Sequence, residues 1–454
     1  FGQVTKREVR NMIKRIAPIL IAILLFLTGC TVNPGETEEA AVAFDKAEYI
    51  VGVGSSVYAG VTLTNAENVT YVSSDPEVAA VSESGKISGI TPGSATITAN
   101  AVAKNDANDK VSAKCTVFVN PSRYETLDGT EAEIKWLGRT FTEAGTVYCY
   151  NTSSGFEARF YGTRFSARIA AAGDKTPQLC VLVDGEDSPA AHIVDLTKNK
   201  STQTYILAED LPRGEHTIRV CKITEAYTTS LGFVSLETDG YFLNRPEDRA
   251  LKLEVYGDSI TAGHKNMRTT PEEPDDSVDK IQNGCMTYAW LAANELNADL
   301  NVMARTGIGI YSAWGRPFVM KDNWDKTYLS ENDFLATETG NPEWDFSRYI
   351  PDIVIINIGT NDYWYDKDET LYQQEMKNFC EELRNVYGSD TKIVLAGGMM
   401  ITENMAALER VAAEFSDGNV TVLQLPESAA NHPRIEDNRA AAEVLADYLK
   451  ELAA

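Results

Sequence analysis

The sequence predicts a multidomain protein in which two β-sandwiches precede an α/β domain of three layers, with a parallel sheet between two layers of helices. Short β-prone runs separated by turn residues fill residues 41–120 and 121–245, whereas apolar strands alternate with helical stretches over residues 246–454. The length of 454 residues agrees with this division, since domains of about 150 residues would give about three.

Residues 1–29 are predicted to be a signal peptide and not part of a domain. Basic residues precede an apolar run, residues 16–27, which is too short to span a bilayer comfortably. Because a signal peptide normally begins at a methionine, here Met12, residues 1–11 are interpreted as an upstream extension of the reading frame. A plain N-terminal membrane anchor is the alternative.

The apolar run ends in Leu27-Thr28-Gly29-Cys30, which resembles the bacterial lipobox. That resemblance implies that Cys30 is lipidated and becomes the first mature residue. Residues 30–40 are small, polar and acidic, as suits a flexible lipidated tether. The expected location is therefore extracytoplasmic, on the cell surface, with a lipid holding the chain to the cell envelope.

Residues 41–120 have the pattern of a small antiparallel sandwich. The stretch VTYVSSDPEVAAV over residues 69–81, then GKI at 85–87 and TPGSATIT at 91–98, resembles a bacterial immunoglobulin-like domain of group 2. Since a fold does not by itself give a function, a passive stalk is favoured over a module with a specific ligand.

Residues 121–245 are again β-rich, and Phe156, Ala158 and Phe160 alternate with charged residues as in a half-buried strand. After residue 245 strands are separated by helices, which requires right-handed crossovers and a parallel sheet. The expected strands are 251–256, 300–303, 351–358, 392–396 and 420–425, and the expected helices are 287–296, 371–387, 405–415 and 438–452.

Composition excludes several kinds of protein. The chain has 41 Lys and Arg against 66 Asp and Glu, a formal charge of −25, so most of its surface would repel a nucleic acid. Six cysteines remain besides Cys30, but no C-x-x-C motif or Cys/His cluster occurs. We therefore expect buried free thiols and no structural zinc site. No other metal and no organic cofactor is implied by the sequence.

Three unusual loops follow predicted strands of the α/β domain, at the carboxyl ends that line the ligand crevice of such sheets. Ser259 lies in Gly257-Asp258-Ser259, where a helix is about to begin and its hydroxyl and N–H are free. Gly307 follows the next strand and Asn361 the third, and each can offer an N–H to a substrate oxygen. Together these residues make a nucleophile and an oxyanion hole of three donors.

A serine nucleophile needs a base to take its proton. The chain has four histidines, of which His192 and His216 belong to the preceding β-domain. His264 lies on the helix expected after Ser259, where its ring would point away from the hydroxyl. His432 lies in the loop before the last helix and can reach Ser259 from the carboxyl edge of the sheet, so it is the predicted base.

Ser259, Gly307, Asn361 and His432 occur in the order typical of the SGNH, or GDSL-like, hydrolases. The β-domain before them contains WLGRTF from residue 136, GEHT from 214 and KITE from 222. With these motifs, residues 121–454 resemble carbohydrate esterase family 2. The resemblance implies a jelly roll packed on an SGNH domain, and a serine esterase that removes acetyl groups from polysaccharides of the acetylated xylan or glucomannan type through an acyl-enzyme.

The sequence departs from the SGNH pattern at one position. These enzymes usually have an Asp shortly before the catalytic His, where it holds the imidazole and stabilises its charged form. The five residues before His432 are Glu-Ser-Ala-Ala-Asn, beginning at Glu427. We therefore predict a Ser-His dyad oriented by a backbone carbonyl, with Glu427 as a weaker candidate, and we expect Asp258 to anchor the turn at Ser259.

Tryptophans in the long loops are candidates for stacking on a sugar ring. We expect most of them to pack the loops, with Trp364, near Asn361, as the substrate-binding exception; the four are Trp314, Trp324, Trp344 and Trp364. The expected partners are an acetylated polysaccharide or oligosaccharide and, through Cys30, a membrane.

Two other functions stay open. An SGNH lipase or thioesterase would prefer long acyl chains. A surface carbohydrate-binding or adhesion protein with an inactive hydrolase domain would bind sugar without releasing acetate. The missing Asp and the group 2 module add some weight to this second alternative.

Overall fold

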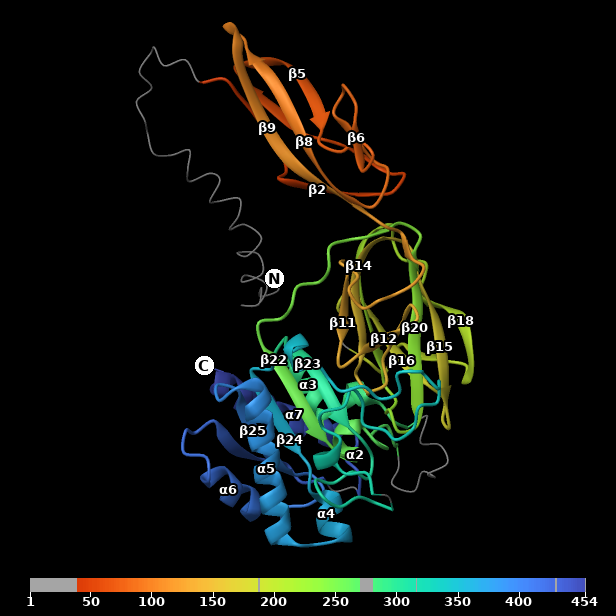
Figure 1. Cartoon of the computed structure of the whole chain (residues 1–454), viewed down its shortest axis with the longest axis vertical. Helices are drawn as coiled ribbons and strands as arrows, with labels where there is room; N and C mark the ends of the chain where they lie inside the picture. The colour runs from red at the N-terminus through yellow and green to blue at the C-terminus, as the bar shows by residue number, and fades with distance from the viewer. Residues whose placement is uncertain (1–38, 187, 270–280, 316, 429–430, 454) are drawn as a thin grey trace, which may run out of the picture.

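The computed structural model describes residues 39–186, 188–269, 281–315, 317–428 and 431–453, and three structural units follow one another along its long axis (Figure 1). The predicted signal peptide, Cys30 and nearly all of the predicted tether lie outside these residues. Within the described ranges, no helix has both the length and the apolar composition needed to cross a membrane.

The first unit, at the top of Figure 1, is a β-sandwich. A sheet of order β2-β9-β8-β5 and a sheet of order β3-β7-β6 share a core that contains Tyr49, Ile87 and Val117, and β1 pairs with β4. One pair departs from the expected antiparallel arrangement: β2 runs parallel to β9, which the long chain between them permits. The strands are β1 (Ala41–Phe44), β2 (Glu48–Gly52), β3 (Ser56–Tyr58), β4 (Val61–Thr64), β5 (Ala66–Ser73), β6 (Ala79–Val81), β7 (Lys86–Gly89), β8 (Gly93–Ala103) and β9 (Asp106–Asn120).

The second unit is also a β-sandwich, and Phe156, Ala158 and Phe160 point into its core as their alternation predicted. One sheet has the order β12-β13-β20-β15-β18 with β10 beside β20, and the other has the order β11-β14-β19-β16-β17 with β21 beside β14. The strands are β10 (Arg123–Tyr124), β11 (Ile134–Leu137), β12 (Phe141–Glu143), β13 (Thr146–Tyr148), β14 (Gly155–Gly162), β15 (Phe165–Gly173), β16 (Gln178–Val183), β17 (Ile193–Asp195), β18 (Asn199–Ala208), β19 (Gly214–Lys222), β20 (Thr229–Thr238) and β21 (Tyr241–Phe242).

The third unit is an α/β domain with a five-stranded parallel sheet of order β23-β22-β24-β25-β26. The order therefore reverses between β22 and β24, which is where open α/β sheets place their ligand crevice. The elements are β22 (Lys252–Gly257), α2 (Ser259–Ala262), η2 (Gly284–Met286), α3 (Tyr288–Glu295), β23 (Asp299–Ala304), η3 (Met320–Asp322), η4 (Phe346–Arg348), β24 (Ile353–Asn357), α4 (Thr360–Tyr365), α5 (Glu369–Tyr387), β25 (Lys392–Gly398), α6 (Met405–Ala413), β26 (Val420–Leu425) and α7 (Ile435–Ala453).

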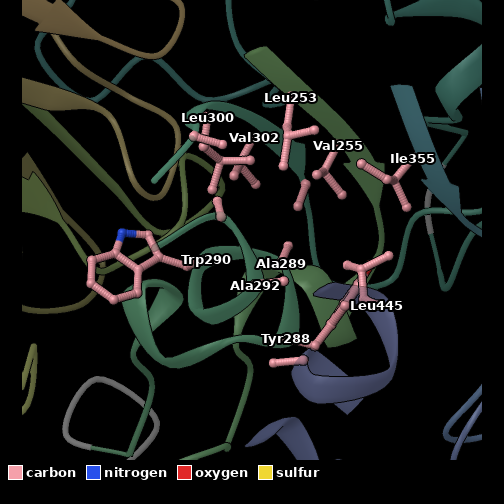
Figure 2. Close-up of a cluster of buried hydrophobic side chains, with 14 of the residues drawn as sticks. Leu253, Val255, Tyr288, Ala289, Trp290, Ala292, Leu300, Val302, Ile355 and Leu445 are labelled. Carbon is pink, nitrogen blue, oxygen red and sulfur yellow. The ribbon is translucent and has the colours of Figure 1, made fainter. Parts of the chain in front are cut away.

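Each face of this sheet packs against a different pair of helices. Val255 belongs to a core with Ala289 of α3 and Leu445 of α7 (Figure 2). The next residue, Tyr256, faces the other way and packs on Phe379 of α5 with a ring-centroid distance of 5.1 Å. Strands buried on both faces account for the nearly continuous apolar sequence of β24.

Buried ion pairs join the second unit to the third. Arg139 pairs with Glu254 of β22 at 3.0 Å, and neither side chain is accessible to solvent. Lys135 of β11 pairs with Asp299 of β23 at 2.6 Å, also with little exposure. Because removing one partner of a buried pair costs about 3 to 5 kcal/mol, the two units depend on each other for stability.

The first unit joins the second at the end of β20 that lies far from the α/β domain (Figure 1). The Thr238 N–H, at the last residue of β20, donates to the Ser122 carbonyl, just after the first unit ends. The other end of β20 follows the turn between β19 and β20, and this turn contacts a loop of the α/β domain. A strand of ten residues spans roughly 30 Å, so β20 separates the first unit from that loop.

Candidate active site

Three loops leave the parallel sheet at the same level. The last residue of β22 pairs with the last residue of β23 and with the last residue of β24. The loops that begin there carry Ser259, Gly307 and Asn361, the residues predicted to act together. The register of three adjacent strands thus brings the three motifs to one edge of the sheet.

Ser259 begins the short helix α2 directly after β22 and is 5% exposed. Asp258 caps this helix, because its Oδ1 accepts a hydrogen bond from the Ile260 N–H at 2.9 Å, so it anchors the turn as expected. At a helix start the N–H groups have no acceptor within the helix, which leaves the Ser259 N–H for another oxygen. Burial raises the pKa of the Asp258 carboxyl to about 7, against the opposing effect of the Ile260 hydrogen bond.

His432 lies in the loop between β26 and α7, and its Nε2 is 3.1 Å from the Ser259 Oγ. This is hydrogen-bond distance for a base and a nucleophile. The sequence predicts His264 on the helix after Ser259, but α2 ends at Ala262 because Gly263 takes a left-handed φ of 76°. The His264 ring instead lies edge to face with the His432 ring, with 4.8 Å between centroids.

Gly307 and Asn361 lie close to one another because the Asn361 side chain is hydrogen-bonded to the loop that carries Gly307. Gly307 has a φ of 81°, which favours glycine, and a Cβ there would lie 3.2 Å from the Trp314 Cβ. The Asn361 Nδ2 donates a hydrogen bond to the Ile308 carbonyl at 2.7 Å. Because an amide nitrogen carries two hydrogens, Asn361 keeps a second donor for a substrate oxygen.

Asp362 fixes the rest of this loop, a role that sequence analysis did not assign. Its carboxylate accepts hydrogen bonds from the N–H groups of Ile310, Tyr311 and Ser312 at 2.9 to 3.0 Å. Burial raises the pKa of Asp362, and these three hydrogen bonds oppose that rise. The donors are backbone groups of an irregular loop, so no residue pattern in the sequence could have identified them.

The second unit also contributes a residue to the site. Glu225, in the turn between β19 and β20, is 1% exposed and accepts hydrogen bonds from the Thr306 N–H at 2.7 Å and the Thr306 hydroxyl at 2.8 Å. Burial raises the pKa of Glu225, and both hydrogen bonds from Thr306 oppose that effect. Since Thr306 precedes Gly307, Glu225 holds the backbone that carries the Gly307 N–H. Sequence analysis missed this contact between residues 81 positions apart.

An open cleft lies over these residues at the junction of the second and third units. Its empty volume, including the open mouth, is about 1180 Å³, and its lining includes Ser259 and His432. Trp364 lines it and is 48% exposed, as expected for the exception among the loop tryptophans. Trp314, expected to pack a loop, lines the cleft too and is 56% exposed, whereas the remaining two loop tryptophans are buried.

The group that orients His432 stays a prediction. Glu427, the weaker candidate, is exposed and is not among the residues that line the cleft. Residues 429 and 430, between Glu427 and His432, lie outside the described residues.

Comparison with known proteins now identifies the units. Residues 136–246 match the N-terminal domain of carbohydrate esterase 2, and residues 255–454 match the GDSL-like lipase/acylhydrolase family. A solved family two carbohydrate esterase from Clostridium thermocellum, in complex with cellohexaose, is 28% identical with a TM-score of 0.63, over 70% of this chain and 99% of that one. Residues 136–454 belong to carbohydrate esterase family 2. Residues 38–115 match the bacterial Ig-like domain of group 2. The predicted family and the predicted class of each unit are therefore confirmed.

Two curated relatives of this chain have esterase names. Cellulase/esterase CelE of Acetivibrio thermocellus is 31% identical over 283 residues, which is 61% of this chain but 32% of that protein, so the chain spans about a third of CelE. An acetylxylan esterase/glucomannan deacetylase of Cellvibrio japonicus is 24% identical over 276 residues, 56% of this chain and 74% of that protein.

Proposed function

We propose that this protein is a serine esterase that removes O-acetyl groups from a polysaccharide of the acetylated xylan or glucomannan type. The observation that carries the proposal is the 3.1 Å contact between His432 Nε2 and Ser259 Oγ in an open cleft. Membership of carbohydrate esterase family 2 supports the reaction class, and the relatives named as acetylxylan esterases and glucomannan deacetylases support the substrate class.

In the proposed mechanism, Ser259 Oγ attacks the acetyl carbonyl carbon while His432 Nε2 takes the hydroxyl proton. The carbonyl oxygen becomes an oxyanion, which the N–H groups of Ser259 and Gly307 and the amide of Asn361 stabilise. The tetrahedral intermediate then breaks the bond to the sugar oxygen, and His432 returns its proton to that oxygen. The sugar hydroxyl leaves, and an acetyl ester remains on Ser259.

Water completes the cycle. His432 takes a proton from the water as its oxygen attacks the acetyl carbon, and the same three donors hold the second oxyanion. The bond to Ser259 Oγ then breaks, the serine oxygen takes the proton back from His432, and acetic acid leaves and ionises to acetate in solution. The steps need no cofactor, because the serine, the histidine and water supply every proton and bond.

The cleft walls suit a sugar chain better than a long acyl chain. Trp314 and Trp364 expose flat aromatic surfaces beside the proposed nucleophile, and such surfaces pack on the apolar face of a sugar ring. We assign substrate binding to Trp364, which lies three residues after Asn361. The cleft is open, as a polymer that extends beyond the site requires.

We also propose that the protein is a lipoprotein of the cell envelope, anchored at Cys30 after removal of residues 1–29, with the Ig-like unit as a spacer. The Leu-Thr-Gly-Cys sequence supports this proposal. Expression in a bacterium with a lipoprotein signal peptidase tests it: the wild-type chain should fractionate with membranes and carry lipid on Cys30, whereas Cys30→Ala should not be lipidated. Equal lipid labelling of both proteins would contradict the proposal.

Acetate release from acetylated xylan, glucomannan and peptidoglycan tests the enzymatic proposal. We expect the wild type to release acetate from xylan or glucomannan, and the matched Ser259→Ala protein to release none. Faster cleavage of octanoyl than acetyl esters would favour a lipase or thioesterase. Sugar binding that Ser259→Ala leaves intact, with no acetate from the wild type, would favour a non-catalytic binding protein.

A further inference from the structure

Three cysteines from separate parts of the chain meet where the second unit packs on the third. Cys180 of β16 and Cys221 of β19 are directly opposite each other in the antiparallel register, and Cys285 comes from η2 of the α/β domain. The three Sγ atoms all lie within 4.8 Å of one another. All three residues are inaccessible to solvent, so the cluster is closed.

A positive charge accompanies the three sulfurs. Arg219 lies two residues before Cys221 on β19, hence on the same face of the sheet. Its guanidinium stacks over the Trp290 ring at 5.1 Å, and its buried Nε–H has no hydrogen-bond acceptor among the described residues, although a Glu157 oxygen lies 3.4 Å away. A cation with a spare donor beside a sulfur favours the thiolate form of that sulfur.

The Arg219 charge acts directly on the Cys221 sulfur and opposes the cost of burying a thiolate there. Thiolates are the form of cysteine that binds metal ions.

We propose that Cys180, Cys221 and Cys285 together bind one thiophilic metal ion of the zinc class. In a tetrahedral site with zinc–sulfur bonds of about 2.3 Å, neighbouring sulfurs lie about 3.8 Å apart. Each sulfur–sulfur distance of the observed cluster therefore has to shorten by about 1 Å at most. Each thiol releases its proton to solvent as its sulfur binds the ion. Three thiolates, a divalent cation and the Arg219 guanidinium then carry no net charge.

The fourth position has an oxygen near it. The Ser153 Oγ lies 3.9 Å from the Cys285 Sγ and comes from the loop before β14. A hydroxyl or a water there would complete a four-coordinate site. The proposed ion would join two strands of the second unit to the third unit, which is a structural role and is independent of the proposed esterase activity.

A disulfide is the competing fate of these sulfurs. Cys180 and Cys221 face each other across two strands, but a disulfide between them would leave Cys285 as an unpaired thiol. Three sulfurs within 4.8 Å of one another, beside a guanidinium, favour metal binding instead. Linear spacing could not predict this cluster, because its members are scattered over more than a hundred residues.

Metal content of the full chain tests the proposal. The reduced protein is exposed to zinc sulfate, passed over a desalting column with a weak chelator, and assayed for zinc by mass spectrometry. We expect about one zinc per chain for the wild type and at least a tenfold loss for Cys285→Ser. Cys380→Ser is the matched control, because Cys380 is also a buried cysteine of the third unit but packs in the core on the other face of the sheet. It should retain zinc like the wild type.

Two further measurements keep the test decisive if Cys285→Ser misfolds. Cobalt added to the wild-type protein should give a sulfur-to-cobalt charge-transfer band, and Cys180→Ala should lose that band. Zinc should raise the unfolding midpoint of the wild type and of Cys380→Ser. No retained zinc and no cobalt band would overturn the proposal, as would equal zinc in Cys285→Ser, or a wild-type mass lower by two hydrogens that shows a disulfide in place of metal.

Discussion

Removing the Glu225 carboxylate should reduce turnover far more than substrate binding. The carboxylate holds Thr306 with hydrogen bonds of 2.7 and 2.8 Å, and one hydrogen bond to a charged group contributes about 1.5 to 3 kcal/mol. The largest loss in rate that we expect is the loss of the Gly307 N–H as an oxyanion donor, because Thr306 positions that group. One missing oxyanion donor costs about 2.7 to 4 kcal/mol, or about 10²- to 10³-fold in kcat. We therefore expect Glu225→Ala to lower kcat by about 10²-fold with little change in KM.

The variant should still fold, for a reason visible in its surroundings. Lys222 is buried near Glu225, and burial holds the pKa of Lys222 well below its ordinary value. The lysine can therefore lose its proton when the carboxylate is removed, so no isolated buried charge remains. Glu225→Gln keeps an acceptor for the Thr306 N–H and should give a kcat between those of Glu225→Ala and the wild type.

Initial rates of acetate release over a range of substrate concentrations measure kcat and KM for these proteins. Glu237→Ala is the matched control, because Glu237 belongs to the same unit but its side chain is 50% exposed. Circular dichroism and thermal unfolding verify the fold of each variant. A folded Glu225→Ala protein with unchanged kcat, or one changed in KM alone, would refute the positioning role.

Three further predictions concern single residues that line the cleft or lie beneath it. Asn361→Ala should lower kcat by about 10²- to 10³-fold with an unchanged unfolding midpoint; activity near that of the wild type would remove Asn361 from the oxyanion hole. Trp364→Ala should raise KM for acetylated oligosaccharides but leave kcat/KM for a small acetyl ester within about threefold, and equal effects on both substrates would contradict a sugar platform. Asp258 has a pKa raised to about 7 in the fold, so folding takes up a proton between about pH 4 and 7 and the wild type loses stability as the pH rises through that range. Relative to the wild type, Asp258→Asn should gain up to about 4 kcal/mol in unfolding free energy between about pH 4 and pH 8; denaturant unfolding at both pH values measures this, and parallel pH profiles would exclude the proton uptake.

The floor of the cleft could be predicted because its residues follow strand ends closely. Ser259, Gly307 and Asn361 each lie within four positions of the last residue of a parallel strand, and adjacent parallel strands end at a common edge. Periodicity identified the strands and most helices, so the motifs could be assigned to one site before any coordinates. His432 followed from the same logic, as the histidine in the loop after the last strand.

The cleft walls and supports could not be predicted, because they depend on how one unit packs on another. Glu225 lies in a turn of a β-sandwich, and no pattern around it reveals that Thr306 will be its partner. Trp314 was expected to be buried, but the loop containing it folds over Gly307 and leaves the ring exposed. The position of His264 depended on where α2 ends, and one left-handed glycine decided that point.

The seam between the second and third units limits how this protein can be recombined. A crossover between genes that fell near residue 248 would separate Glu225 from Thr306 and Arg139 from Glu254, so a hybrid would inherit half of two buried contacts. The first unit meets the rest of the chain at the distant end of β20 and touches neither contact. Evolution and laboratory cloning can therefore exchange the first unit as a cassette, whereas the other two have to be inherited as one piece.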